Sequence, residues 1–233
     1  MASFLITGAS RGLGLALARH LASLPASDVG KVFASARGDS PALEELAKNS
    51  SGRVFAIRLD TTNEASIKEA AAEVERKLEG KGLDVLINNA GICQYAFGGV
   101  KSMDNLAESF TTNVLGIHWV TRAFLPLLQK GTLKKVANIS TTLGSITLAR
   151  KNHYFPAPAY KISKAAMDAL TWMKTDLGGG DMADLTPEEG AKASLDIIFK
   201  PGQEFNGQMP KVLVKGWENA KGNNQYDGTN APW

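Results

Sequence analysis

Thr7-Gly8-Ala9-Ser10-Arg11-Gly12-Leu13-Gly14 is the stretch that decides the fold of this chain. A short apolar run before it, Ser3–Ile6, is typical of a buried parallel strand, and Leu15–Leu24 after it is expected to form a helix. The three glycines permit a tight turn, a close approach to a bound phosphate and close packing of helix on strand. Because a helix N-terminus presents free N–H groups, this segment predicts a dinucleotide cradle rather than an ordinary glycine turn.

The composition indicates one globular domain spanning residues 1–233. Apolar residues make up 44% and charged residues 21%, which is ordinary for a soluble protein. The net charge of +3 and the scattered lysines and arginines argue against a nucleic-acid partner. Cys93 is the single cysteine and favours a reducing compartment. With no basic leader and no apolar run of membrane-spanning length, we expect a cytoplasmic protein that does not enter a membrane.

The second expected strand, Lys31–Arg37, bears on the choice of cofactor. Its end lies about twenty residues beyond the glycine loop, where the adenosine ribose is recognised. NAD-selective enzymes usually carry a carboxylate there, whereas this strand ends in Ser35 and Arg37, and Arg11 lies inside the loop. Two cations favour a 2′-phosphate, so we expect NADP(H), with NAD less favoured. Arg37 as a solvated strand-end charge, or Asp39 as a ribose acid, are the alternatives.

Strand and helix patterns continue to alternate along the chain, with polar residues where the strands end. We expect helices over Pro41–Lys48, from the Asn63 cap to Leu78, and over Asn105–Gln129, and strands over Arg53–Leu59, Leu83–Ile87 and Lys135–Ser140. This alternation predicts an α/β fold with a Rossmann-type doubly wound parallel sheet.

Three motifs occur in one order: Thr7-Gly-x-x-x-Gly12-x-Gly14, Asn88-Asn-Ala-Gly91, and Tyr160-x-x-x-Lys164. With them the sequence resembles the single-domain short-chain dehydrogenase/reductase family, from the first strand to about Asp168. The stretch Ser140–Ile146 and the Asp-Gly…Pro-Trp ending are similar to sniffer-like carbonyl reductases. The resemblance implies one Rossmann-fold domain, with a cofactor half over about 1–112 and a catalytic and substrate half over about 113–233.

The resemblance also implies roles for individual residues, with Asp60 beside the adenine and Asn88 along the cofactor wall. The implied cofactor-binding residues are Gly8, Ser10, Arg11, Gly12, Leu13, Gly14, Arg37, Asp60, Asn88, Ala90, Gly91, Tyr160, Lys164 and Thr175. The implied catalytic residues are Asn113, Ser140, Thr141, Tyr160 and Lys164. No metal is expected, because His118 and His153 do not repeat at a metal-ligand spacing.

Two of the implied catalytic positions can also be judged from their neighbours. Asn113 lies in an otherwise apolar helix and needs a buried partner, whether it acts in catalysis or is a structural amide. The family places its catalytic serine three residues before Gly144, where this chain has Thr141. Threonine keeps a hydroxyl donor with fewer rotamers, and Ser140 is the second candidate. Both hydroxyls could instead bond strand-end amides.

Tyr160 and Lys164 carry the expected chemistry. Four residues apart on a helix, they share one face. A phenol, with an ordinary pKa near ~10, becomes a useful acid or base when an ammonium beside it favours phenolate. The family's reaction is hydride transfer between nicotinamide and a small-molecule carbonyl or alcohol, in which Lys164 would also hold the nicotinamide ribose and Asn113 a water. Taken alone, the two residues would be an ordinary surface pair.

Aromatic side chains accompany this pair in the sequence. Tyr95, Phe97, Tyr154 and Phe155 fall in loops near the expected reactive residues. They could line an apolar substrate pocket, or they could cover the edges of the core.

The pattern breaks after Lys164. Thr171–Gly180 resembles the family's segment over the nicotinamide, but the span from Lys164 to Thr175 is too short for a helical crossover of about a dozen residues plus a strand. We therefore expect the usual sixth strand and the end of the catalytic helix to be missing. Pro187–Phe199 is expected to be a helix and Lys211–Val214 a last strand. A homo-oligomer is possible, but the missing segment would weaken its interface. The alternative function is that of a nucleotide-binding, catalytically impaired family member.

Overall fold

The structure is a computed structural model that describes residues 1–170, 174–176, 185–200, 210–219 and 225–232. The chain divides into two compact units. The first unit comprises Met1–Ala90 and Gly116–Ala137, and the second comprises Gly91–Leu115 and Asn138–Trp233. The glycine loop therefore belongs to the first unit, and the Tyr160–Lys164 pair belongs to the second.

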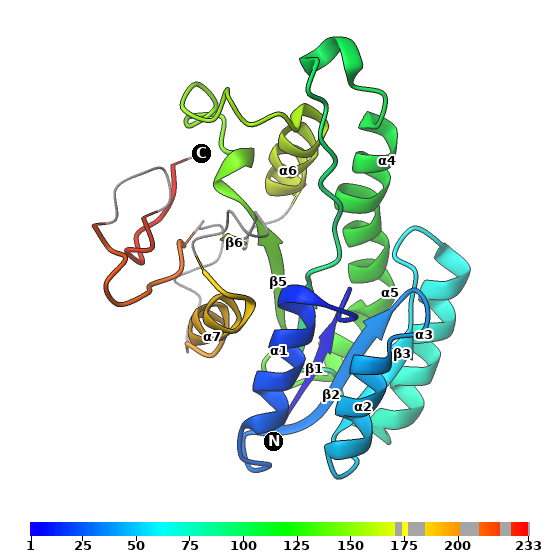
Figure 1. Cartoon of the computed structure of the whole chain (residues 1–233). Helices are drawn as coiled ribbons and strands as arrows, with labels where there is room; N and C mark the ends of the chain where they lie inside the picture. Colours follow the sequence, from blue (N-terminus) through cyan, green and yellow to red (C-terminus); the bar gives the residue numbers. More distant parts are fainter. Residues whose placement is uncertain (171–173, 177–184, 201–209, 220–224, 233) are drawn as a thin grey trace. The chain divides into compact units, whose positions relative to one another are not determined.

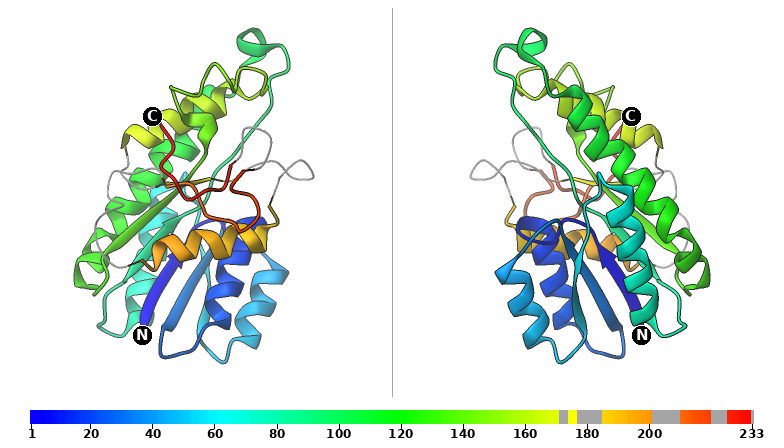
Figure 2. Two further views of the ribbon diagram at one scale, coloured as in Figure 1. Left: turned by 90° about the vertical axis from the view of Figure 1, so that its left-hand side faces the viewer. Right: turned by 90° about the vertical axis from the view of Figure 1, so that its right-hand side faces the viewer.

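The first unit is a parallel sheet with helices on both faces, as the alternating pattern predicted. The strands lie in the order β3-β2-β1-β4-β5. They are β1 (Ala2–Ile6), β2 (Val29–Ala36), β3 (Val54–Arg58), β4 (Val85–Asn88) and β5 (Lys135–Ser140), whose first half lies in this unit. The helices are α1 (Gly12–Ser23), α2 (Pro41–Asn49), α3 (Glu64–Leu78) and α5 (Gly116–Lys130). Helices α1 and α2 cover one face of the sheet, and α3 and α5 cover the other (Figures 1 and 2).

The central strands are apolar on both sides because both faces of the sheet are covered. Leu5 of β1 pairs in parallel register with Phe33 of β2 and with Leu86 of β4, and all three side chains are fully buried. On the face of α3 and α5 they pack with residues such as Val74 and Phe124. This core holds the carboxyl ends of β1, β2 and β4 at one edge, where a doubly wound sheet binds its ligands.

The second unit carries the helical segments around the expected catalytic residues. It contains a 3₁₀ turn η1 (Gly99–Ser102), helix α4 (Leu106–Phe110), a π-helical turn η2 (Thr111–Leu115), the second half of β5, a 3₁₀ turn η3 (Thr142–Gly144), α6 (Pro158–Leu170), β6 (Lys174–Asp176) and α7 (Pro187–Ile198). Thr186 caps α7 by accepting from the backbone N–H of Glu189, whose carboxylate accepts in return from the Thr186 backbone. The expected helix over Pro187–Phe199 is thereby confirmed.

The region after Lys164 differs from the sequence-based expectation. Helix α6 runs on to Leu170, and a short strand β6 then pairs in parallel with the second half of β5, Ile139 opposite Thr175. This corrects the expectation that the span could not hold a sixth strand. The span suffices because this strand has only three residues instead of the usual five or six.

The expected last strand, Lys211–Val214, forms only isolated antiparallel bridges. Pro210 pairs with Asn230, and Leu213 pairs with Asp227. The segment packs instead through Val212, which is buried with Leu185 and Ala193. The run of three apolar residues predicts burial, and Val212 is buried here without a continuous ladder in the described residues. Within the described residues, no helix combines the length and apolar character required to cross a bilayer.

Asp84 joins three segments of the first unit just before β4. Its Oδ2 accepts from the backbone N–H (2.8 Å) and the hydroxyl (3.0 Å) of Ser3. Its Oδ1 accepts from the backbone N–H groups of Thr132 (2.7 Å) and Leu133 (3.2 Å). This buried carboxylate therefore aligns the starts of β1, β4 and β5.

We expect Asp84→Ala to lower the free energy of unfolding by at least about 2 kcal/mol, because several buried donors lose their acceptor. Urea denaturation followed by circular dichroism measures this loss. Glu69→Ala, on the exposed side of α3, is the matched control and should change stability by less than about 0.5 kcal/mol. Equal stability of the two variants would contradict this role of Asp84.

Candidate active site

The glycine loop of the first unit has the backbone that an anion site needs. Helix α1 starts at Gly12, and the N-cap residue Arg11 is extended and makes no side-chain capping bond. The N–H groups of the first turn are therefore not used by a side-chain cap, which leaves them suited to a phosphate. Gly12 has φ +55°, and a Cβ added there would point into open space. The backbone at Gly12 is therefore open to an approaching ligand.

A second loop, Asn88–Gly91, braces the glycine loop. The Thr7 hydroxyl accepts from the backbone N–H groups of Asn89 and Ala90, each at 3.0 Å. The Asn89 amide donates to the carbonyl oxygens of Thr7 (2.9 Å) and Gly8 (3.0 Å). A Cβ on Gly14 would lie 2.3 Å from the Gly8 oxygen and 2.5 Å from this amide, so only glycine fits. Thr7 and Asn89 were not singled out from the sequence, although both stand inside the quoted motifs.

The other predicted cofactor residues of the first unit lie on its loops. Arg11 and Arg37 are exposed, and the Ser10 carbonyl accepts from Ser40 at 3.2 Å. Burial alone would raise the pKa of Asp60, but hydrogen bonds from Thr62 and the Arg37 guanidinium bring it below its ordinary value. Asp60 is therefore a carboxylate that acts electrostatically on Arg37.

Two further predicted residues of this unit, Leu13 and Asn88, are less exposed. Leu13 is half-buried in the first turn of α1. The Asn88 amide donates to the Thr121 hydroxyl on α5 at 3.1 Å, and its side chain is almost fully buried. Asn88 is therefore fixed in place at the end of β4.

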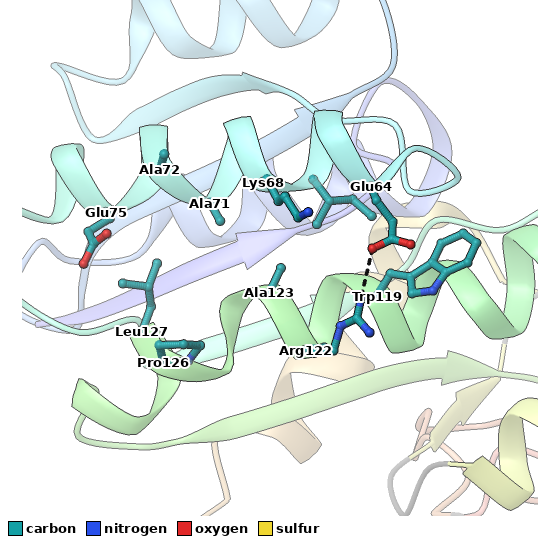
Figure 3. Close-up of a pocket in the computed structure, with 11 residues that line it drawn as sticks. Glu64, Lys68, Ala71, Ala72, Glu75, Trp119, Arg122, Ala123, Pro126 and Leu127 are labelled. Carbon is teal, nitrogen blue, oxygen red and sulfur yellow. Dashed lines mark hydrogen bonds and ion pairs between the residues drawn. The ribbon is translucent and has the colours of Figure 1, made fainter.

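A groove of about 430 Å³ lies elsewhere on the first unit, between α3 and α5 (Figure 3). Arg122 and Glu64 form an ion pair at 2.8 Å across it, beside Trp119. None of the predicted site residues lines this groove. Glu64 and Glu75 of the groove are paired with Arg122 and Lys130 of α5, and the groove holds none of the residues expected to carry the reaction.

Asn113 occupies the π-helical turn between α4 and α5. Its side chain is fully buried, and Oδ1 accepts from the Ile92 backbone N–H at 2.9 Å. Nδ2 donates to the Ile92 carbonyl at 2.9 Å and to the Ser163 hydroxyl at 3.0 Å. The expected buried partner is therefore present. Insertions of this helical type frequently mark functional sites.

The two hydroxyls at the end of β5 have different partners. The Ser140 hydroxyl donates to Asp168 Oδ1 at 2.5 Å. The Thr141 oxygen accepts from the Leu143 backbone N–H at 3.3 Å, which leaves its own O–H to be donated. Of the two candidates, Thr141 is thus the one with a hydroxyl proton to offer a substrate oxygen.

Lys164 and Tyr160 lie on one face of α6, as their spacing predicted. Lys164 is buried, its Nζ donates to the Ile139 carbonyl at 2.7 Å, and it lies 5.9 Å from the centre of the Tyr160 ring. Burial lowers the pKa of Lys164 to about 8, against the opposing effects of Asp168 and Cys93. The Ser163 hydroxyl donates to the Tyr160 carbonyl at 2.9 Å. Lys164 is therefore a cation held next to a phenol, with a pKa within the working range of an enzyme.

Two predicted cofactor residues remain in the second unit, and Asp168 is an addition to them. Gly91 leaves room for Asn113 Oδ1, which a Cβ would meet at 3.2 Å. The backbone of Thr175 lies in β6, and its side chain is outside the described part of the chain. Asp168 was noted in the sequence only as the end of the resemblance. Its position one helical turn after Lys164 was the available signal.

Three of the four predicted aromatic residues form a cluster on the second unit, while the ring of Tyr154 lies against His153 instead. Tyr95 lies 5.7 Å from the ring centres of both Phe97 and Phe155. The Ala96 N–H donates to the Pro156 carbonyl at 2.7 Å, which joins this loop to the segment before α6. Tyr95 is 47% exposed and Phe97 is 84% exposed, so the cluster presents apolar surface to its surroundings.

Known proteins similar to this chain fall into one family. The family described as short chain dehydrogenase matches residues 3–176. The chain is 39% identical over 179 residues to the short-chain dehydrogenase/reductase AacuF of Aspergillus aculeatus, a match that covers 73% of this chain and 65% of that protein. For three of the curated relatives that it matches, the match covers between 42% and 65% of the relative's length.

Solved structures agree in fold. The carbonyl reductase Sniffer of D. melanogaster matches over the full length of both chains, with 29% identity and a TM-score of 0.82. The NADPH-bound carbonyl reductase from chicken fatty liver matches over 100% of this chain and 99% of that one, with 28% identity and a TM-score of 0.80.

We expect Asn113→Leu to lower the free energy of unfolding by about 3 kcal/mol, because the Ile92 backbone groups and the Ser163 hydroxyl lose a buried partner. Thermal and urea denaturation measure the loss. Thr111→Ala in the same π-helical turn removes one exposed hydrogen bond, to the Ala107 carbonyl, and should cost less than about 1 kcal/mol. Similar losses in both variants would show that Asn113 has no special structural role.

Proposed function

The chain belongs to the short-chain dehydrogenase/reductase family, and we propose that it is an NADP(H)-dependent oxidoreductase of carbonyl or alcohol substrates. The observation that carries this proposal is the buried Lys164 cation beside the Tyr160 ring, with the Thr141 hydroxyl directly after the strand that Lys164 contacts. These three groups supply the acid, the cation and the hydrogen-bond donor that carbonyl reduction needs.

The residues of the first unit fit a dinucleotide. The helix start at Gly12 and the braced glycine loop suit its phosphates, and the carboxylate of Asp60 lies at the adenosine side according to the family resemblance. The exposed Arg11 and Arg37 favour the additional 2′-phosphate of NADP(H). The NADPH bound by the chicken carbonyl reductase supports the same choice. When bound, NADPH supplies the hydride for the carbonyl carbon.

The side chains of the second unit bind the carbonyl oxygen and transfer the proton to it. Thr141 donates a hydrogen bond to the carbonyl oxygen and orients it, while Tyr160 delivers a proton to the same oxygen. The Lys164 ammonium makes the phenol a stronger acid, because a nearby cation favours the phenolate that remains. Asn113 fixes the loop at Ile92 and helix α6 at Ser163, and so keeps these groups in place. In the reverse direction Tyr160 accepts the proton of an alcohol.

The aromatic cluster supports an apolar substrate. Tyr95, Phe97 and Phe155 stand on loops joined to the segment that leads into α6 and Tyr160. Flat apolar surface of this kind binds aromatic or extended hydrocarbon groups through burial and ring stacking. We therefore propose aldehydes, ketones or diketones with a bulky apolar substituent as the substrate class.

We expect the purified protein to bind NADPH more tightly than NADH and to oxidise NADPH in the presence of an aromatic ketone or diketone. Tyr160→Phe should lower kcat by about 10²–10⁴-fold, because it removes the proton donor and keeps the ring. Nucleotide fluorescence measures binding, and absorbance at the reduced-nicotinamide band measures turnover.

Binding and turnover together separate the enzyme from its alternative, a nucleotide-binding and catalytically impaired family member. The short β6 is the feature that favours this alternative. NADPH binding without turnover on any carbonyl, unaffected by Tyr160→Phe, would establish the alternative. Failure to bind either nucleotide would reject both.

The pKa of Lys164 predicts the pH dependence of the reaction. With a pKa of about 8, the ammonium form is present below that pH and is lost above it. Carbonyl reduction measured as kcat/KM, which reports the free enzyme, should therefore fall as the pH rises through about 8. A flat profile between pH 7 and 9 would contradict the role of the cation.

The lowered pKa of Lys164 also makes the free energy of unfolding depend on pH, and the protein is expected to become more stable as the pH rises above about 8. Because burial disfavours the ammonium, its cost to stability is fully present below the folded-state pKa. That cost shrinks as the pH rises from about 8 toward the ordinary lysine pKa of 10.5.

A further inference from the structure

Asp168 is a buried carboxylate one helical turn beyond Lys164 on α6. Its side chain is 3% exposed, and Oδ1 accepts the Ser140 hydroxyl at 2.5 Å. A short hydrogen bond from a hydroxyl to a carboxylate is of the strong, charge-assisted kind. Ser140 immediately precedes Thr141, so this bond fixes the backbone from which the Thr141 hydroxyl projects.

The turn after Thr141 lies directly on the same carboxylate. A Cβ added to Gly144 would approach Asp168 Oδ2 to 3.0 Å, the backbone carbon of Lys164 to 3.0 Å and the nitrogen of Ala165 to 3.1 Å. Glycine at 144 therefore allows η3 to seal Asp168 from solvent against α6. The buried charge then needs a nearby counter-charge, because an isolated carboxylate in such a place is costly.

Lys164 is a cation that interacts electrostatically with Asp168. Asp168 is the strongest of the charges that raise the pKa of Lys164, and Cys93, on the loop after Gly91, is the other. Among the side chains that the structure describes, no other charge shifts the pKa of Lys164. Asn113 of η2 is neutral, β5 offers the Ile139 carbonyl, and Glu108 of α4 is exposed and accepts from Gln94. Tyr160 is the other titratable neighbour.

We propose that Asp168 is a positioning residue of the reaction, whose carboxylate anchors Ser140 beneath the Thr141 turn and keeps Lys164 in its ammonium form. The inference rests on the proposed function in one respect, since it assigns that ammonium to catalysis. Two effects of one side chain are combined: its hydrogen bond sets the place of the Thr141 donor, and its charge sets the protonation of the cation beside Tyr160.

Asp168→Asn separates these two effects. Asparagine keeps an oxygen that can accept the Ser140 hydroxyl, but it removes the charge. We expect the alkaline limb of kcat/KM for carbonyl reduction to move to lower pH by about one unit or more, which is a loss of about fivefold or more at the wild-type midpoint. The ¹³Cε signal of Lys164 in lysine-labelled protein, assigned with Lys164→Met, should titrate at correspondingly lower pH.

Three further variants complete the experiment. Asp196→Asn on α7 removes an exposed carboxylate paired with Lys192 and should leave the titration of Lys164 unchanged. Ser140→Ala removes the anchor but keeps the Asp168 charge, so stability should fall while Lys164 titrates near its wild-type pH. If Asp168→Asn does not fold, Asp168→Ser provides a second uncharged side chain for the same titration.

The outcomes distinguish this inference from the proposed function. A Lys164 signal that titrates identically in the wild type and in the uncharged Asp168 variants, with only the melting temperature lowered, would overturn the role of Asp168. A shifted Lys164 titration in a protein that turns over no carbonyl would support the electrostatic role of Asp168 and reject the proposed function.

Discussion

The second unit depends on one buried amide, that of Asn113. It bonds both backbone groups of Ile92 and the hydroxyl of Ser163, and in this way joins the loop after β4 and helix α6 to the π-helical turn. A regular α-helix at this position would rotate each later residue away from its place, so the extra residue of the π turn and the amide depend on each other. The amide has no equally good substitute, because an apolar side chain leaves three buried groups unpaired and a carboxylate adds a charge.

In the first unit, a glycine and a threonine hold the glycine loop in place. Gly14 permits α1 to start against the Gly8 carbonyl and the Asn89 amide, and the Thr7 hydroxyl receives two backbone N–H groups from the neighbouring loop. The Thr7 hydroxyl and the Asn89 amide thus bond backbone groups of the two loops that have no partner in a helix or strand. The consequence is a rigid loop whose first helical turn is not capped by a side chain. A site that binds by backbone N–H groups needs such rigidity, because a mobile loop would lose entropy on binding.

Much of the fold and of the candidate site could be predicted from the sequence. The features that could not be predicted were missed for physical reasons. The alternation of apolar strands with helices predicted the sheet of the first unit, and the Asn63 cap is confirmed by its bond to the Ser66 N–H at 3.0 Å. Periodicity could not predict β6, because three residues are too few for a pattern. It also could not predict that Lys211–Val214 forms isolated bridges in the described residues, because burial of a side chain does not specify the pairing partner of a strand. The buried position of Asp168 could not be predicted, because a lone acidic residue on a helix is ordinarily exposed to solvent.

The hydroxyls of Ser140 and Thr141 show how the fold resolves a choice that the sequence left open. Successive side chains of an extended chain point to opposite sides. Ser140 ends β5, and Thr141 continues it with φ −156° and ψ 147°, so the two hydroxyls point in different directions and take different partners. The Ser140 hydroxyl donates a hydrogen bond to Asp168 of α6. The Thr141 oxygen accepts from the Leu143 N–H, so its own O–H is still available to a substrate. The chain therefore uses threonine where its family usually has serine, and the added methyl restricts the rotamers of a donor whose backbone is already held by its neighbour.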